Sequence, residues 1–227
     1  MISRNLHDWH VSTVQARAIQ GELAGLVSRE GDAEDAHLVA GVDISVQGSA
    51  GVGRGAVVVV KYPELTVEEI QIAEEGLALP YIPGLLSFRE APVMLAACEK
   101  LSCTPDLIMV DGQGIAHPRR LGLASHLGLL WDRPTLGCAK SRLCGEHSPV
   151  GPEQGEFCEL IDNGEKIGAV VRTRANVKPI YVSIGHKIGL EAGIRWVLSL
   201  CRGFRLPEPT RLAHLAAGGK LTGQLSF

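Results

Sequence analysis

The chain has 227 residues, of which 45% are hydrophobic and 21% charged. These fractions lie near the average of globular proteins, so they exclude a disordered or a collagen-like chain. The net charge of −3 indicates no particular partner, and no apolar run approaches the ~20 residues that cross a bilayer.

The first part of the chain predicts one helix followed by three strands. Apolar residues at helical spacing indicate an amphipathic helix over 13–29. The β-branched runs 37–46 and 56–62, and then the stretch 65–76, predict successive strands. The glycine-rich segment 47–55 between the first two is typical of a loop or hairpin turn. Three strands in succession favour an antiparallel meander.

The middle of the chain changes to alternating helices and strands. A helical pattern runs from about Leu85 to Leu101, with Pro92 expected at a kink or in the first turn. A short buried strand within 104–112, a helix over 119–131 and a strand over 134–140 follow. This succession predicts a parallel pair of strands joined by a right-handed crossover.

The last part predicts a hairpin, a strand and two helices. Asn163-Gly164 is a strong signal for a type I′ turn within a hairpin over 156–173. Neither an internal repeat nor a long linker divides the chain, so we expect a single domain over 1–227 of the α/β class. Its central mixed sheet would start as an antiparallel meander and continue with parallel strands. The remaining predicted elements are a strand at 179–186, helices at 190–203 and 207–217, and a loose tail at 218–227.

Two aspartates stand at the ends of apolar strands, Asp43 in the first and Asp111 in the segment LIMVDGQG. A carboxylate at such a place is costly unless something pairs with it. Ligand sites in open α/β sheets gather beyond the carboxyl ends of the strands, where these two side chains would converge. Either residue alone could be a helix N-cap or a turn former. Together they favour a divalent cation such as Mg²⁺, which takes one or two carboxylates.

Four further residues allow both a structural and a functional interpretation. Glu90 could be an acid favoured at a helix start, His214 a core residue of the last helix, and Lys140 a solvated cation. Tyr81 stands between two prolines in LPYIPG. It is either a hydrophobic staple at a helix start or a rigidly held ring suited to stacking on bases or wedging between them.

Taken in order, six segments resemble the endonuclease V family, the deoxyinosine-specific nicking enzymes of DNA repair. The second and third segments are long and specific, and the set spans about residues 40–214. The segments are AGVDIS (40–45), PYIPGLLSFREAP (80–92), PDLIMVDGQGIAHPRRLGLASHLG (105–128), PTLGCAKSRLCG (134–145), PIYVSIGH (179–186) and PEPTRLAH (207–214).

The resemblance implies a ribonuclease-H-like fold, with a central mixed β-sheet flanked by helices, and a nuclease that depends on Mg²⁺, with Mn²⁺ as a substitute. It implies cleavage of the second phosphodiester bond on the 3′ side of deoxyinosine, leaving 3′-hydroxyl and 5′-phosphate ends. It assigns metal binding to Asp43, Asp111 and Glu90, and it completes the catalytic set with Lys140 and His214.

The resemblance also implies how DNA would be held. It makes Tyr81 a wedge that fills the place of an everted base, and it expects glycine-lined backbone to read that base. The expected DNA-binding residues are Tyr81, Pro80, Ile82, Pro83, His117, Arg119 and Arg142, and the expected inosine pocket comprises Gly84, Leu86, Gly112 and Gly122.

The charge distribution and the alternatives complete the prediction. Basic residues gather in 117–142 and 172–211, which suits a phosphate-binding face, although ordinary scatter of solvated charges gives a similar pattern. The alternatives are a ribonuclease specific for inosine in RNA, another nuclease of this fold, and a non-catalytic nucleic-acid-binding module, which the carboxylates disfavour. The chain start lacks a secretory signal and no cysteines have C-x-x-C spacing, so we expect a cytoplasmic monomer with reduced thiols and no membrane contact.

Overall fold

The computed structural model describes residues 1–47, 51–77 and 79–221. Five helices lie within these ranges: α1 (Thr13–Ala24), α2 (Leu86–Glu99), α3 (Leu123–Trp131), α4 (Leu190–Ser199) and α5 (Glu208–Ala217). The strands in the same ranges are β1 (Leu38–Gln47), β2 (Val52–Lys61), β3 (Thr66–Gly76), β4 (Leu107–Val110), β5 (Thr135–Ala139), β6 (Phe157–Asp162), β7 (Glu165–Val171) and β8 (Ile180–His186).

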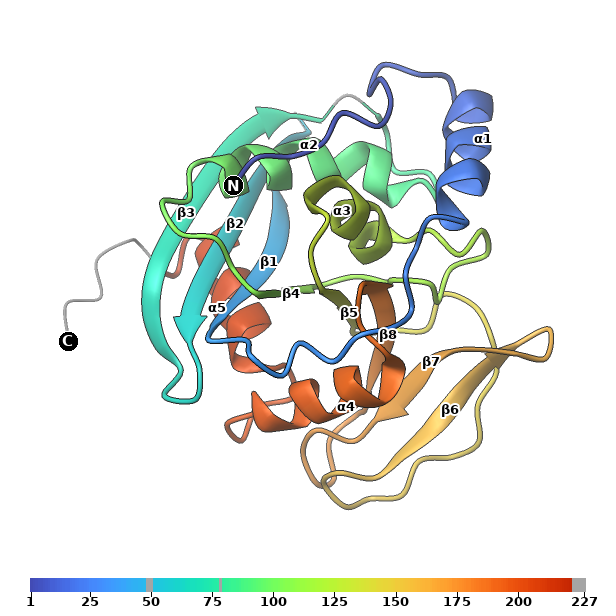
Figure 1. Cartoon of the computed structure of the whole chain (residues 1–227), viewed down its shortest axis with the longest axis vertical. Coiled ribbons are helices and arrows are strands. Elements are labelled where there is room, and N and C mark those ends of the chain that lie inside the picture. Colours follow the sequence, from blue (N-terminus) through green and yellow to red (C-terminus); the bar gives the residue numbers. More distant parts are fainter. Residues whose placement is uncertain (48–50, 78, 222–227) are drawn as a thin grey trace.

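All eight strands join one mixed sheet in the order β3-β2-β1-β4-β5-β8-β7-β6 (Figure 1). The first three form the expected antiparallel meander. β4 then pairs in parallel with both β1 and β5, and α3 lies between β4 and β5 in the chain, as predicted for a crossover. The predicted α/β class with a mixed sheet flanked by helices is therefore confirmed.

The last three strands are antiparallel, and they include the hairpin that was predicted over 156–173. β8 runs antiparallel to β5, and β7 and β6 continue antiparallel from it. The cause of the last pairing is local, because Asn163 and Gly164 take φ of 52° and 80° at the predicted turn. Both values are those of a type I′ turn, which returns β7 directly alongside β6.

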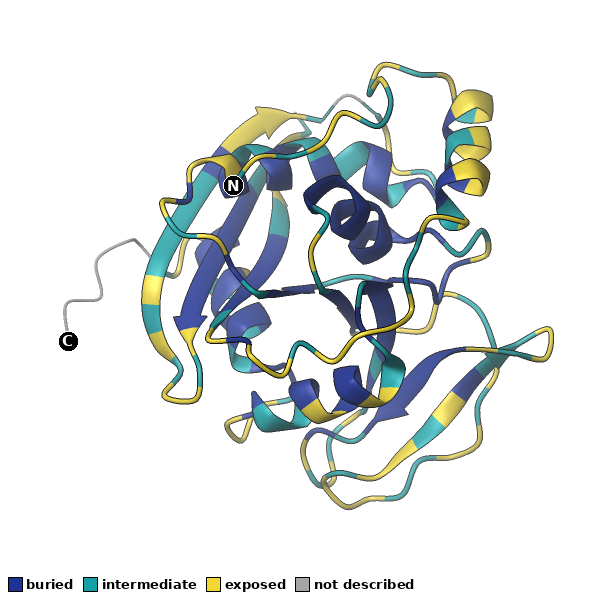
Figure 2. Ribbon diagram, viewed as in Figure 1, coloured by how far each residue is buried: buried dark blue, intermediate teal, exposed yellow. Residues whose placement is uncertain are grey.

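Helices cover both faces of the sheet and divide the apolar residues between two cores. Strand residues alternate between the faces, so Val58 and Met109 pack in the core that includes residues of α4 and α5. Val57 and Ile108 point the other way, into the core that includes residues of α2 and α3. The central strands and the inner sides of the helices are accordingly buried, whereas α1 and β3 are more exposed (Figure 2).

Several predicted helices are shorter than expected. α1 ends at Ala24 with Gly25 as its C-cap, and the chain beyond it runs beside the end of β8, where Lys187 N–H donates to Ser28 O. α3 starts at Leu123 because Arg120 has a φ of 56°, which interrupts a helix. α4 ends at Ser199 rather than 203.

The segments around glycine and proline also differ from the prediction. β2 begins at Val52, so Gly53 and Gly55 are strand residues rather than loop residues, and 48–50 lie outside the described residues. A Cβ at Gly55 would lie 2.9 Å from the carbonyl oxygen of Val93, so glycine here allows α2 to pack closely on the sheet. Pro92 lies inside α2.

Three predictions about the whole chain have a more limited outcome. The tail prediction falls partly on 222–227, which lie outside the described residues, and the single domain over 1–227 stays a prediction. All six cysteines are free thiols. Along the described ranges, every helix is too short or too polar to traverse a bilayer.

Candidate active site

Asp43 and Asp111 meet at the same edge of the sheet. β1 and β4 are parallel neighbours with Val42 opposite Val110, so the next residue of each chain segment is an aspartate. The backbone N–H of Asp111 donates to Val42 O at 3.0 Å, which fixes this alignment. The predicted convergence of the two aspartates is confirmed, but Asp43 does not stand at a strand end, because β1 continues to Gln47. The two side chains meet where the pairing of β1 with β4 stops, after Val42 and Val110.

His214 joins the two aspartates from α5. Its Nδ1 donates to Asp43 Oδ2 at 2.7 Å. The start of α5 packs tightly on β1, because a Cβ at Gly41 would lie 2.0 Å from Pro209 O. One ligand atom each from Asp43, Asp111 and His214 lie within 4.8 Å of one another, and we call these three residues the acidic cluster. The cluster is suited to holding a cation that accepts carboxylate and imidazole ligands.

Two carboxyl groups of the site, those of Asp43 and Glu90, resist ionisation. Burial and the nearby charge of Asp111 together raise the pKa of Asp43 to about 6, although the hydrogen bond from His214 opposes the rise. Burial likewise raises the pKa of Glu90, on α2, to about 7, with Arg89 opposing and the two aspartates adding to the rise. Mutual repulsion of carboxylates is a reason for a cation to bind between them.

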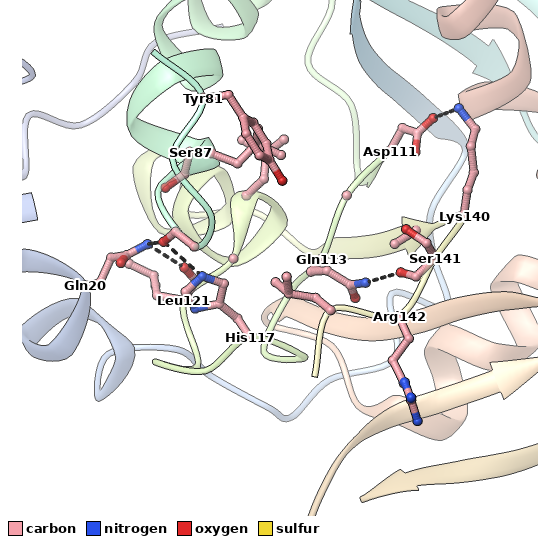
Figure 3. Close-up of a pocket in the computed structure, with 17 residues that line it drawn as sticks. Gln20, Tyr81, Ser87, Asp111, Gln113, His117, Leu121, Lys140, Ser141 and Arg142 are labelled. Atoms are coloured by element: carbon pink, nitrogen blue, oxygen red, sulfur yellow. Dashed lines mark hydrogen bonds and ion pairs between the residues drawn. The ribbon is translucent and has the colours of Figure 1, made fainter. Parts of the chain in front are cut away.

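Glu90 and Lys140 flank the acidic cluster. Glu90 feels the charges of both aspartates, but it is not one of the three residues that share the 4.8 Å group, so its role as a metal ligand stays a prediction. Lys140 follows β5, and its Nζ forms an ion pair with Asp111 Oδ2 (Figure 3). Three neighbouring parallel strands thus contribute two carboxylates and an ammonium group to one edge.

A cavity of about 420 Å³ opens beside Asp111 and Lys140. This volume falls within the usual range of small-ligand pockets. Its walls come from α1, the loop before α2, the β4–α3 loop and the segment after β5 (Figure 3). The lining includes all four residues expected for an inosine pocket, Gly84, Leu86, Gly112 and Gly122, and three of the expected DNA-binding residues, Tyr81, His117 and Arg142.

The carbonyl of Gly84 anchors the loop that carries Tyr81. It accepts hydrogen bonds from Gln20 Nε2 at 3.0 Å, His117 Nε2 at 3.1 Å and Arg119 Nη2 at 2.6 Å. Gly84 has a φ of +77°, and a Cβ there would lie 2.7 Å from the same Arg119 nitrogen. Three donors on one carbonyl therefore fix the loop against α1 and the β4–α3 loop.

His117 and Arg119 occupy supporting positions around this carbonyl. His117 is buried, and burial lowers its pKa to about 4, so the ring is neutral near pH 7. Its Nδ1 accepts from the Arg119 N–H at 3.1 Å, which leaves Nε2 to carry the hydrogen donated to Gly84. Their direct contact with DNA stays a prediction, and the structure gives both residues a role in holding the loop.

The loop itself divides its residues between an anchor and an exposed ring. Ile82 packs against the small apolar cluster that contains Leu85 and Phe88. Tyr81 is 67% exposed and lies at the cavity, which argues against the buried staple. Arg142 is also exposed, and its guanidinium points away from Asp111 (Figure 3). DNA contacts of Pro80, Ile82, Pro83 and Arg142 stay predictions.

Sequence reasoning missed the amide side chains of the cavity wall. Gln20 is buried although it stands on the amphipathic helix α1, and its Oε1 accepts from Arg119 Nε at 2.6 Å. Gln113 is buried too, and its Nε2 donates to Ser141 O at 2.8 Å, which ties the β4–α3 loop to the segment after β5. The sequence does carry a signal for Gln20, because this polar residue shares the apolar face of the helix with Ala16 and Leu23. The other lining residues outside the prediction are Ser87, Leu121, Leu123, Ala139, Ser141 and Leu143.

The fold and the acidic cluster define an α/β protein with a candidate metal site beside a ligand-sized cavity. The family model of endonuclease V matches residues 21–215. Endonuclease V of Dehalococcoides mccartyi (strain BAV1) is 50% identical over 214 residues, which are 94% of this chain and 96% of the relative. The chain therefore belongs to the endonuclease V family.

Solved structures of the family agree with this placement. The crystal structure of endonuclease V from Streptomyces avermitilis is 38% identical and has a TM-score of 0.88, with 93% of each chain covered. Endonuclease V of Ciona intestinalis, solved with a 24-mer DNA that contains an inosine followed by a ribo-adenosine, is 27% identical with a TM-score of 0.76. That match covers 91% of this chain and 96% of the other.

Proposed function

We propose that this protein is a metal-dependent endonuclease that nicks DNA at the second phosphodiester bond on the 3′ side of deoxyinosine. The products would carry 3′-hydroxyl and 5′-phosphate ends. The observation that supports this most strongly is the acidic cluster beside a cavity lined by all four residues expected to hold the base. Family membership and the inosine-containing DNA in the Ciona complex support the same substrate.

The residues of the cluster fit a Mg²⁺ or Mn²⁺ ion. The carboxyl groups of Asp43 and Asp111 and the imidazole of His214 face each other, and burial beside like charge destabilises the Asp43 carboxylate without a cation. A bound ion would supply Lewis-acid activation of the phosphate and a water of lowered pKa. Asp43 and Asp111 would hold it directly, His214 would act on it through a water, and we keep Glu90 as a further ligand in the proposal.

The chain's own groups then position the reactants. The Nδ1 of His214 is engaged by Asp43, so its other ring nitrogen is left to bond and orient a water. The ammonium group of Lys140 lies at Asp111, where it would offset negative charge that develops on the phosphate. Both groups act on the phosphate side of the cavity, which separates the chemistry from base recognition.

Recognition of the base would use the backbone of the cavity. Hypoxanthine differs from adenine by an O6 acceptor and an N1–H donor, which peptide N–H and C=O groups can read once the base is everted. Gly112 and Gly122 let the backbone line the wall, and the anchored Gly84 loop presents the exposed Tyr81 ring at the rim. This ring would take the place of the everted base in the stack.

A nicking assay with mapped cut positions tests the proposal. The substrates are 5′-labelled duplex and single-stranded oligonucleotides with one deoxyinosine, matched strands with deoxyadenosine there, and an RNA strand with inosine. We expect a single cut at the second phosphodiester bond on the 3′ side of deoxyinosine. The cut should appear in the presence of Mg²⁺ or Mn²⁺ and should be absent in EDTA. Cutting of the deoxyadenosine strand at an equal rate, or of RNA alone, would contradict the proposal.

The remaining parts of the proposal concern the protein's state in the cell. We propose that it acts as a monomer, because the cluster and the cavity are both built by one chain. Residence in the cytoplasm stays a prediction. Sedimentation of the purified protein with and without the deoxyinosine duplex measures the stoichiometry, and a dimer on DNA would contradict the monomer.

A further inference from the structure

Arg205 connects the segment between α4 and α5 to the backbone of Lys140. Its Nη2 donates to Lys140 O at 2.6 Å and to Pro179 O at 2.8 Å. Lys140 directly follows β5, and Pro179 directly precedes β8, its antiparallel neighbour. One guanidinium group therefore joins the end of one strand to the beginning of the next at the edge that carries the acidic cluster.

Arg205 is itself firmly placed. The buried Thr173 donates its hydroxyl to Arg205 O at 2.5 Å, from the segment after β7. Two residues further on, Pro207 caps α5, whose start packs against β1 at Gly41. The Nε of Arg205 is buried without a hydrogen-bond partner, so this side of the group is turned into the protein and away from a ligand. The guanidinium thus acts between backbone carbonyls.

The lysine needs such support. Its side chain is 39% exposed, and its ammonium group forms the ion pair with Asp111 at the end of a long flexible stem. The position of a terminal ammonium group also depends on where the backbone of its residue lies, so the placement of the main chain at residue 140 affects the ion pair. A misplacement of about 1 Å can cost ~100-fold in rate.

We propose that Arg205 is a positioning residue that fixes the backbone of Lys140 and thereby aims its ammonium group at Asp111 and the scissile phosphate. The inference rests on the proposed function, because Lys140 is proposed to offset negative charge on the phosphate during the hydrolysis described above. Arg205 would act through Lys140 alone and would not contact the substrate.

A double-mutant cycle on nicking of the deoxyinosine duplex tests this inference. We expect Arg205→Ala to lower kcat by about 10- to 100-fold, with KM and the DNA dissociation constant within about 2-fold of wild type. Arg205→Lys should recover part of the loss, because an ammonium group can still donate to one carbonyl. Arg205→Ala combined with Lys140→Ala should be no slower than Lys140→Ala alone.

The control variant is Arg202→Ala, which removes an exposed arginine of the same loop. Arg202 donates its hydrogen bonds to the carbonyls of Ser199, Cys201 and Pro63 and makes none to Lys140. Its nicking rate should equal that of wild type. Fully additive losses in the double variant would overturn the inference. A weaker DNA affinity of Arg205→Ala with a reduced salt dependence would also overturn it, because that result reveals a contact between Arg205 and a phosphate.

A structural readout separates this inference from the proposed function. Crystal structures of the metal-free wild type and of Arg205→Ala need neither substrate nor activity. We expect the Lys140–Asp111 pair in the wild type, and a displaced Lys140 within an otherwise unchanged fold in the variant. An undisturbed pair in the variant would refute the role of Arg205, whereas a wild type that leaves deoxyinosine DNA intact would refute the proposed function.

Discussion

The charge of Glu90 should make the metal-free protein less stable at neutral pH. Burial and the charges of Asp43 and Asp111 raise the pKa of Glu90 from 4.5 to about 7. The folded protein therefore holds this proton more tightly than the unfolded chain. The stability gained in this way is complete below about pH 4.5 and is lost as the pH rises through about 7.

Replacing Glu90 with Gln removes the charge and keeps the shape. A pKa difference of one unit corresponds to 1.36 kcal/mol, so the loss at pH 7.5 amounts to about 3 kcal/mol for the shift from 4.5 to about 7. We expect Glu90→Gln to be more stable than wild type by up to this amount in EDTA. For a chain of this size the melting temperature should rise by roughly 6–12 °C.

Thermal unfolding followed by circular dichroism between pH 4.5 and 8 measures this difference. In EDTA the wild type should lose stability relative to Glu90→Gln as the pH rises, and the two should converge near pH 4.5, where Glu90 is protonated. Addition of Mg²⁺ at pH 7.5 should stabilise the wild type more than the variant. Glu22→Gln, which changes an exposed acid of α1, is the control and should shift nothing. Equal stability of Glu90→Gln and wild type at pH 7.5 would refute the reasoning.

Three further predictions concern nicking. Asp111→Asn should reduce nicking of deoxyinosine DNA by at least about 100-fold, with binding in EDTA nearly unchanged by fluorescence anisotropy; parallel loss of both would point to misfolding. Tyr81→Ala should lower the ratio of kcat/KM for deoxyinosine over undamaged DNA, whereas an equal loss on both would contradict the wedge. Gly84→Ala introduces a Cβ 2.7 Å from Arg119 Nη2 at a φ of +77°. It should strain the loop by about 1–2 kcal/mol and weaken selectivity for deoxyinosine, and unchanged selectivity would argue against the anchor.

Local patterns sufficed for the elements and for the two aspartates. Period and β-branching locate the strands, and parallel neighbours bring Asp43 and Asp111 to one edge because both follow the same register. The direction of β8 was not available in the same way. Its antiparallel pairing with β5 depends on the path of the chain between them, which strand composition does not encode.

Contacts between distant segments explain most of what the sequence left open in the site. Gln20 reaches Gly84 across 64 positions and Leu121 across 101, and no local pattern marks such a pair. His117 was expected to bind DNA, and the structure shows a buried, neutral ring whose two nitrogens both form hydrogen bonds within the protein. The sequence therefore placed His117 correctly near the cavity, but its role in holding the loop follows only from its packing in the folded protein.

The two kinds of charge in the site are held by different means. Asp43 lies within β1 and Asp111 directly follows the parallel strand β4, so the sheet itself fixes their carboxylates. The cationic and imidazole partners are long or exposed side chains, with Lys140 39% and His214 57% exposed. Their positions depend on backbone contacts elsewhere, the close approach of α5 to β1 for His214 and the Arg205 bond for Lys140. Substitutions at those contacts should therefore impair the chemistry while leaving the carboxylates in place.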